Sequence, residues 1–388
     1  MAQFAIAEPA TITGSPQAIG FRLGYRPELD GLRGISILLV FVHHFYHRYL
    51  PGGFLGVDIF FVLSGFLITS LLLEEWNRGG SISLRNFYIR RALRLMPALL
   101  ALVLVLGVFA RIFLSGTGAL KTYQGIWLAL SYVSNWLYAF DYASADNPLG
   151  ITWSLAIEEQ FYLLWPLILR FVLRAGISRR GLLYALALSV AVVILYRSLL
   201  LNLGASITRL YYASDTRADA LLIGCLLAIL VALDPFPRNR RFEFCMKLLA
   251  AVAFVFLAFM ALRSTWIDLV SYQGVPFTII PLSAAVILVV LIKWPVRIAV
   301  SALRFAPLVW IGRVSYGLYL WHWPVRWFIY GRQPLPTSTA QLLAAVFLSL
   351  ALTTLSYYFI EKPFLRLKNR FSYVQPAIEI SPAEGPVS

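Results

Sequence analysis

The residues best suited to chemistry in this sequence are ionisable side chains inside apolar segments. The first such segment carries Arg33 and His44, which are eleven residues apart. In an α-helix this separation differs by about 20° from three full turns, so both side chains share one face, about 16 Å apart. An ionisable group in an apolar segment is costly, and by default it marks a site, a pathway or a buried pair.

Other polar residues are expected at a similar depth in later segments. At a rise of about 1.5 Å per residue, His44 lies about 20 Å from the start of its segment and His322 at a similar height in its own. Asp58, Glu158 and Glu159 lie near the corresponding ends of two further segments. These groups could converge on one polar cavity that contains histidine.

A different cluster opens the third apolar segment. Arg90 and Arg94 lie four residues apart, so they share one face of a helix. Paired guanidinium groups can bind phosphates through bidentate hydrogen bonds. This pattern indicates an anionic, phosphate-bearing ligand at the opposite end of the helices from the histidines.

The helices that position these residues are strongly apolar. Of 388 residues, 60% are hydrophobic and 13% are charged, with a mean hydropathy of +0.76, whereas a soluble domain has about 25% charged residues. This composition excludes a water-soluble globule, a disordered chain and a fibrous protein, and it indicates an all-α polytopic membrane protein. Ten spans of roughly 18–22 residues are predicted at 31–49, 54–73, 92–113, 152–173, 181–201, 215–233, 246–263, 274–292, 308–329 and 340–360.

The basic residues predict the orientation of these transmembrane helices. The net charge is +15, and most of the 33 Lys and Arg residues fall in alternate loops, which places those loops and both termini in the cytoplasm. The aromatic-rich segment 123–140 is predicted to lie at the headgroup level, because an eleventh span would scramble this pattern. The expected organisation is a cytoplasmic segment 1–25, a membrane domain 26–366 and a disordered cytoplasmic tail 367–388, without a cleavable signal peptide.

Several functional classes are disfavoured by motifs that the sequence lacks. It has no Gly-x-Ser-x-Gly elbow, no Gly-x-x-x-x-Gly-Lys-Ser/Thr loop and no His-Glu-x-x-His zinc motif. Its basic residues lie between apolar segments, so no nucleic-acid partner is expected. Two alternatives stay open: His44 and His322 as axial haem ligands, and a proton-coupled membrane transporter, although no inverted repeat is found.

Longer motifs point to one family. Arg33 and His44 form an Arg-x10-His motif, and Arg90 and Arg94 form an Arg-x3-Arg motif. In this order, and together with four further segments, they resemble the acyltransferase-3 family of integral-membrane O-acyltransferases over residues 26 to 366. The further segments are Gly53–Phe66, Thr152–Pro166, Ser315–Pro324 and Phe359–Pro363.

The resemblance implies an enzyme of the bacterial cytoplasmic (inner) membrane. Such enzymes move an acyl group, often acetyl, from acyl-CoA to a hydroxyl of an extracytoplasmic carbohydrate or of a small natural product such as a macrolide. His44 is then the essential histidine, and Arg33, Arg90 and Arg94 serve the CoA side. Acyl-CoA is a donor substrate, so no resident cofactor or metal is expected. Some relatives carry an extracytoplasmic hydrolase-like domain, which we expect this protein to lack.

The expected chemistry is the attack of an alcohol on a thioester. A neutral imidazole can take the proton of the hydroxyl, because its reference pKa is near 6.5. A carboxylate on the other ring nitrogen would set the tautomer, and Asp58, Glu158 and Glu159 are candidates by depth. Direct transfer and an acyl-histidine intermediate are both open.

The remaining site residues are expected around the reacting groups. Arg33, a tryptophan N–H or the backbone could stabilise the thioester oxyanion. Glu159, His322 and Trp153 are predicted on the side of the acceptor.

Overall fold

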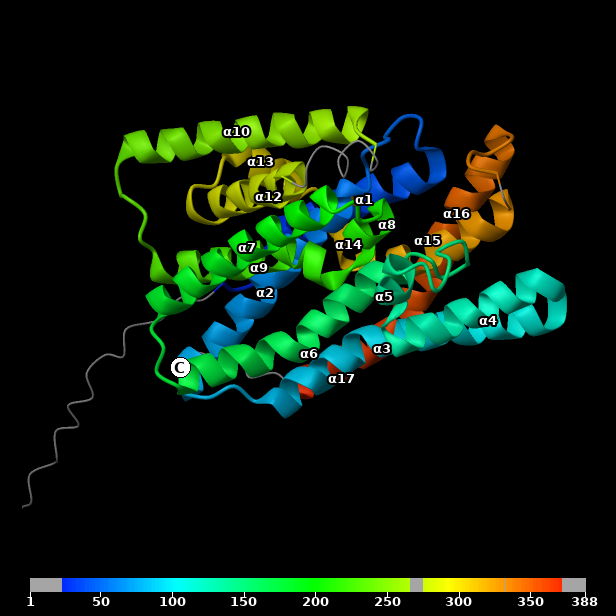
Figure 1. The fold of residues 1–388 in the computed structure, drawn as a ribbon, viewed down its shortest axis with the longest axis horizontal. Helices are drawn as coiled ribbons and strands as arrows, with labels where there is room; N and C mark the ends of the chain where they lie inside the picture. Colours follow the sequence, from blue (N-terminus) through cyan, green and yellow to red (C-terminus); the bar gives the residue numbers. More distant parts are fainter. Residues whose placement is uncertain (1–22, 266–274, 332, 372–388) are drawn as a thin grey trace, which may run out of the picture.

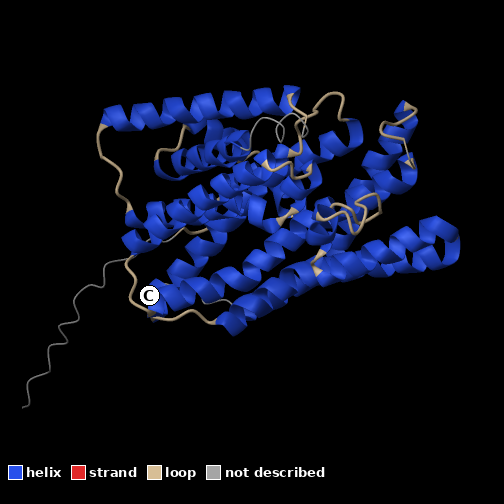
Figure 2. Ribbon diagram, viewed as in Figure 1, coloured by secondary structure: helices blue, strands red, loops and turns tan. Residues whose placement is uncertain are grey.

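The computed structural model describes residues 23–265, 275–331 and 333–371. Within these residues every regular element is a helix (Figure 2), which confirms the all-α prediction for this part of the chain. Most of the predicted segment 1–25 and tail 367–388 lies outside the described residues, as does residue 274 at the start of one predicted span.

The longer helices follow the predicted apolar segments. They are α1 (Pro27–Tyr46), α2 (Leu55–Gly79), α3 (Leu84–Phe113), α6 (Thr152–Arg174), α7 (Arg179–Asn202), α9 (Ser214–Leu233), α10 (Arg240–Arg263), α12 (Val275–Lys293), α15 (Ser315–Tyr330) and α16 (Thr339–Leu355). The shorter elements are α4 (Gly116–Ser131), α5 (Ser134–Ala139), α8 (Ile207–Tyr212), α13 (Arg297–Leu303), α14 (Ala306–Arg313), η1 (Ser356–Glu361), α17 (Lys362–Lys368) and η2 (Asn369–Phe371).

Six helices among the described residues are long and apolar enough to cross a membrane. A seventh span results if α12 and α13, which are bent by 103° relative to each other, count as one. The other predicted spans correspond to α1, to α6 and to α14 with α15. Helices α1 and α6 are not among the helices that are apolar enough, and they carry the charged and polar candidate residues. The segment formed by α14 and α15 is divided at Val314. The number ten and the cytoplasmic position of the termini stay predictions.

The aromatic-rich segment 123–140 does not form one continuous helix. It is divided between α4 and α5 at Tyr132, whose φ of 52° lies in the left-handed region. Both helices are shorter than the roughly 20 residues that a span needs. This break agrees with the prediction that the segment is not an eleventh span.

Small residues allow the helices that carry the site to approach closely. A Cβ atom on Gly312 of α14 would lie 1.8 Å from the carbonyl oxygen of Asp30 in α1, and one on Gly224 of α9 would lie 2.2 Å from that of Val62 in α2. Backbones can touch only where such a side chain is missing, as is common between membrane helices. These contacts set the position of α1 and α2 in the bundle.

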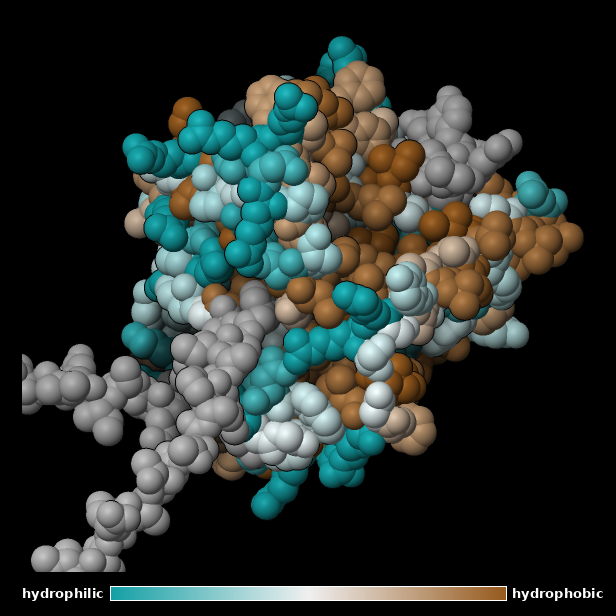
Figure 3. Space-filling view, turned by 90° about the vertical axis from the view of Figure 1, so that its left-hand side faces the viewer, coloured by the Kyte–Doolittle hydropathy of each residue, from teal (hydrophilic) through white to brown (hydrophobic). Residues whose placement is uncertain are grey.

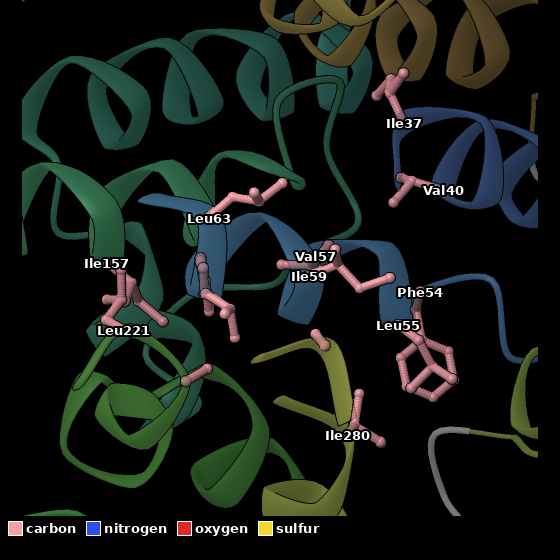
Figure 4. Packing of buried hydrophobic residues seen from close by; sticks show 14 of the residues in the cluster. Ile37, Val40, Phe54, Leu55, Val57, Ile59, Leu63, Ile157, Leu221 and Ile280 are labelled. Atoms are coloured by element: carbon pink, nitrogen blue, oxygen red, sulfur yellow. The ribbon is translucent and has the colours of Figure 1, made fainter. Parts of the chain in front are cut away.

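The core lies between α1, α2, α6, α9 and α12. Figure 4 shows aliphatic side chains from all five helices, among them Ile37, Ile59, Ile157, Leu221 and Ile280, which all belong to one buried cluster. The helix crossings at this cluster keep the inward faces of α1 and α6 in place.

The polar loops gather at one end of the bundle. In Figure 1, α6 ends and α7 and α10 begin at the left, with α10 along one side of the molecule and α3 and α4 along the other. Figure 3 looks onto that end and shows many hydrophilic side chains on it. This is the end that the basic residues assign to the cytoplasm.

Candidate active site

Helix α1 extends along two cavities. Arg33 lines an inner cavity of about 280 Å³, and His44 lines an outer cavity of about 810 Å³. Pro27 stands in the first turn of α1, where its fixed φ favours the start of a helix, and His44 lies in the last turn. The spacing of eleven residues therefore places the two side chains in separate compartments rather than in one site.

Four arginines line the inner cavity, together with the carboxylates of Asp30 and Glu158. The arginines are Arg26, Arg33, Arg91 and Arg94. Arg33 donates a hydrogen bond to Ser315 Oγ at 3.2 Å. Neither Arg33 nor Arg94, both half-buried, forms an ion pair with a carboxylate of the described residues. A cation withdrawn from water without a counter-ion is unfavourable, so this cavity is suited to an anionic ligand.

The Arg-x3-Arg motif does not include Arg91, which lies three residues before Arg94 and lines the inner cavity with it. Its guanidinium carbon stands 3.3 Å from the centroid of the Tyr162 ring, and its Nε is 3.7 Å from a carboxylate oxygen of Glu159. The spacing i,i+3 brings side chains together on a helix as well as i,i+4 does, and that signal was available in the sequence.

Arg90, predicted to act with Arg94, does not line the inner cavity. It pairs with Glu75 at 3.2 Å and donates to the carbonyl oxygen of Phe371 at 2.8 Å. It borders a neighbouring cavity of about 220 Å³, to which Arg91, Arg94 and Lys368 also contribute. Arg91 and Arg94 line both cavities, so the role of Arg90 on the donor side stays a prediction.

The two glutamates expected near the histidines belong to the inner region instead. Glu158 lines the inner cavity and accepts a hydrogen bond from Ser64 Oγ at 2.6 Å, and Glu159 faces Arg91. A depth estimated along one helix does not tell which way a side chain points, so residues at one height can face different cavities. Neither carboxylate contacts His44.

Asp58 does not orient the histidine either. It is buried between α2 and α9, where its Oδ1 accepts a hydrogen bond from Arg217 at 2.9 Å. Close by, Arg197 pairs with Asp219 at 2.9 Å and donates to Thr278 Oγ1. These fully buried ion pairs join α2, α7, α9 and α12 and account for Asp58 as a structural residue.

The partner of His44 is a second histidine. His44 Nδ1 lies 2.8 Å from Nε2 of His322, which is fully buried on α15. The Nδ1 atom of His322 lies 2.9 Å from the carbonyl oxygen of Leu318. Axial haem nitrogens would stand about 4 Å apart across the iron, given metal–nitrogen bonds of about 2 Å, so this geometry contradicts the haem alternative.

The outer cavity combines aromatic rings with a few polar groups. Trp323 lies edge-on to His44 with ring centroids 4.8 Å apart, and Arg326 donates to the backbone carbonyl of His44. Such a mixed lining is typical of a binding site for a small organic ligand. Trp153 also lines this cavity, and its place beside the acceptor stays a prediction. The other residues of the wall include Asp146, Tyr211, Tyr212 and Trp327.

The two cavities are neighbours. Trp153 and Ser154, adjacent in α6, line the outer and the inner cavity respectively. The hydroxyl of Tyr319 joins this wall through Ser154 Oγ at 2.6 Å and the carbonyl oxygen of Ile151 at 3.0 Å. Hydrogen-bonded residues of α6 and α15 therefore separate the arginine-lined inner cavity from the histidines.

Most of this chain is similar in sequence to known proteins. A family model described as an acyltransferase domain matches residues 26–360. The putative peptidoglycan O-acetyltransferase YrhL of Bacillus subtilis is 36% identical over 350 residues, which cover 87% of this chain and 55% of the relative. The peptidoglycan O-acetyltransferase OatA of Listeria monocytogenes is 36% identical over 78% of this chain and 49% of its own length.

The O-acetyltransferase OatA of Staphylococcus aureus is 35% identical over 360 residues, or 87% of this chain and 57% of the relative. The chain therefore spans about half the length of the curated relatives it matches. No solved structure matches it.

Proposed function

The chain belongs to the acyltransferase-domain family, and from that premise we propose that it is a membrane O-acyltransferase. Its donor is acyl-CoA, with acetyl as the first candidate for the acyl group, and its acceptor is a hydroxyl of a carbohydrate. The donor enters from the cytoplasm, and the acceptor lies on the opposite face of a bacterial cytoplasmic membrane.

One observation carries this proposal: a single helix links an anion-binding cavity to a histidine in the adjacent cavity. The phosphates of CoA suit the guanidinium groups of Arg33, Arg91 and Arg94. The long, flexible arm of the donor can then extend along α1 toward His44, about 16 Å away along the helix axis. A ligand with phosphates at one end and a reactive carbonyl at the other matches both cavities.

His44 acts as the general base. The acceptor oxygen attacks the thioester carbon, its proton passes to the imidazole, and the carbon–sulfur bond breaks as the thiolate leaves and takes up that proton. Arg33, a tryptophan N–H or the backbone stabilises the oxyanion. The three candidate carboxylates, Asp58, Glu158 and Glu159, are engaged with other groups, so none of them orients His44 in this mechanism.

The wall of the outer cavity supports a carbohydrate acceptor. Trp153, Trp323 and Trp327 offer flat apolar surfaces for sugar rings, and Asp146 and Arg326 offer hydrogen-bonding groups. Two of the relatives are named for peptidoglycan, which puts peptidoglycan glycans first among the acceptors to test.

The same proposal includes ten transmembrane spans and cytoplasmic termini. Helices α1, α6 and α14 with α15 also cross the membrane, because the bundle of more apolar helices surrounds their polar groups. This arrangement exposes the basic loops to the cytoplasm and the outer cavity to the other side.

The direct test supplies labelled acetyl-CoA to the cytoplasmic face of membranes that contain wild-type protein, His44→Ala or Val42→Ala. Val42 lies on the exposed side of the same helix and serves as the matched control. We expect label in glycans, a loss of about 10²- to 10⁴-fold for His44→Ala, and little change for Val42→Ala. Equal incorporation by wild type and His44→Ala overturns the role of His44, and label in a small molecule instead of a glycan overturns the acceptor class.

A further inference from the structure

His322 is the middle member of a hydrogen-bond chain that no carboxylate enters. Its ring is fully buried among aromatic side chains, with the rings of Phe41, Phe45 and Tyr319 at centroid distances of 5.9, 6.3 and 5.7 Å. One ring nitrogen faces the carbonyl oxygen of Leu318 and the other faces His44. Burial without a carboxylate in contact favours the neutral ring.

The position of each hydrogen in this chain follows from the carbonyl group. A carbonyl oxygen can only accept, so Nδ1 of His322 carries its hydrogen and donates it to Leu318. A neutral imidazole has one N–H, so Nε2 of His322 is an acceptor. The Nδ1 atom of His44, which lies 2.8 Å away, is therefore the donor.

This arrangement places the lone pair of His44 on Nε2. That atom has no partner among the described residues, and it is not one of their buried polar atoms without a partner. His44 also lines the outer cavity, so Nε2 is open to it. In the opposite tautomer the lone pair would point at His322 and an N–H at the acceptor, and His44 could not take up the proton of the hydroxyl.

We propose that His322 is a positioning residue that holds His44 in the tautomer with a basic Nε2. This inference rests on the proposed function, because it requires His44 to be the general base. When the acceptor proton reaches Nε2, the imidazolium of His44 donates from Nδ1 to His322 through a stronger, charge-assisted hydrogen bond. The proton then moves from Nε2 to the departing thiolate, and both histidines end neutral.

Two substitutions at His322 separate this role from simple packing. In His322→Gln the side-chain amide oxygen can still accept the N–H of His44, whereas His322→Leu fills a similar volume and removes the acceptor. Trp321→Phe is the matched control, because Trp321 is a buried neighbour of His322 on α15 that lines neither the inner nor the outer cavity. Each variant is purified as the full chain in detergent, and its melting temperature, kcat and donor KM are measured with acetyl-CoA.

We expect kcat to fall about 100-fold in His322→Leu and about tenfold in His322→Gln, with donor KM within twofold of wild type. Trp321→Phe is expected to keep kcat within about twofold. Partial recovery by glutamine is the signature that a purely structural role does not produce. If His322→Leu does not fold, the folded His322→Gln variant tests the role of His322, and we expect its kcat to lie within about tenfold of wild type.

The inference is overturned if folded His322→Leu keeps wild-type kcat, or if folded His322→Gln is as inactive as His44→Ala. His44→Ala separates this failure from that of the proposed function. If His44→Ala is active, His44 is not the general base and the proposed function fails with it. If His44→Ala is inactive and His322→Leu is fully active, only the proposed role of His322 is wrong.

Discussion

Four arginines within the helical bundle fall into two regions that differ in what faces the positive charge. Arg197 and Arg217 are fully buried, and each is 2.9 Å from an aspartate oxygen. Arg33 and Arg94 are half-buried in the wall of the inner cavity and have no carboxylate partner among the described residues. The first region is internally compensated, whereas the second leaves positive charge for a ligand.

This contrast separates charged residues that form structural ion pairs from charged residues that are available to bind a ligand. An ionisable residue in an apolar segment is a candidate for function by default, but Arg217 with Asp58 and Arg197 with Asp219 join helices without facing either large cavity. A charge whose partner is missing is the better guide to a binding site.

The compensated region is expected to dominate stability. Arg217→Met leaves the carboxylate of Asp58 buried without its partner, which should destabilise the protein by about 3–5 kcal/mol. The double variant Arg217→Met with Asp58→Leu should recover much of that loss, since it removes both charges. Thermal unfolding in detergent measures both, and an equal loss in single and double variants would show that the pair does not act as a unit.

The uncompensated region should affect donor binding instead. Arg33→Gln removes one guanidinium from the inner cavity and should raise donor KM about 10- to 150-fold, because hydrogen bonds to charged groups are worth about 1.5–3 kcal/mol. The melting temperature should not fall, since no carboxylate loses its partner. A large drop in stability with unchanged donor KM would place Arg33 with the structural arginines.

Arg91 lies between the two classes, because it has an aromatic and an acidic neighbour as well as a place in the cavity wall. Arg91→Leu should raise donor KM about tenfold, and it should lower stability by at least about 1 kcal/mol, because it removes the contacts with Tyr162 and Glu159. Tyr162→Leu is the matched variant, and it should reproduce the part of the stability loss that comes from the aromatic contact, with a smaller change in donor KM. Identical donor KM in wild type and Arg91→Leu would exclude Arg91 from the donor site.

The smallest effect is expected at Glu158, which lines the inner cavity together with a second carboxylate, Asp30. Glu158→Gln removes a negative charge near the anionic donor, so donor KM should fall about threefold, the size of a screened interaction between partly exposed charges. The amide can still accept the hydrogen bond of Ser64, and kcat should stay near wild type. A large fall in kcat with unchanged donor KM would show that Glu158 takes part in the chemistry.

Local patterns predicted a substantial part of this protein. Long runs of apolar residues indicate helices, because a segment in the hydrocarbon core of a membrane has no water to bond to and must satisfy its backbone hydrogen bonds internally. The spacing of Arg33 and His44 places them on one face of one helix, because the repeat of about 3.6 residues per turn is a property of every α-helix. The Arg-x10-His and Arg-x3-Arg motifs also led to the family that the comparison confirmed.

Local patterns failed where a residue finds its partner on another helix. Depth along a helix suggested Asp58, Glu158 and Glu159 beside His44, yet each is engaged elsewhere. The same depth estimate correctly places His322 at the height of His44, and the two side chains are in contact although they are 278 positions apart in the chain.

The sequence by itself determined the helical segments, the residues that share a face within one helix, and the family. Only the tertiary structure decided that Arg33 and His44 face two cavities, that Arg91 joins Arg94, and that a histidine rather than a carboxylate contacts His44. The physical reason is that hydrogen bonding within a helix depends on neighbours in the chain. The rotation and crossing of helices depend on close contacts between distant segments, such as the approach of Gly312 to Asp30.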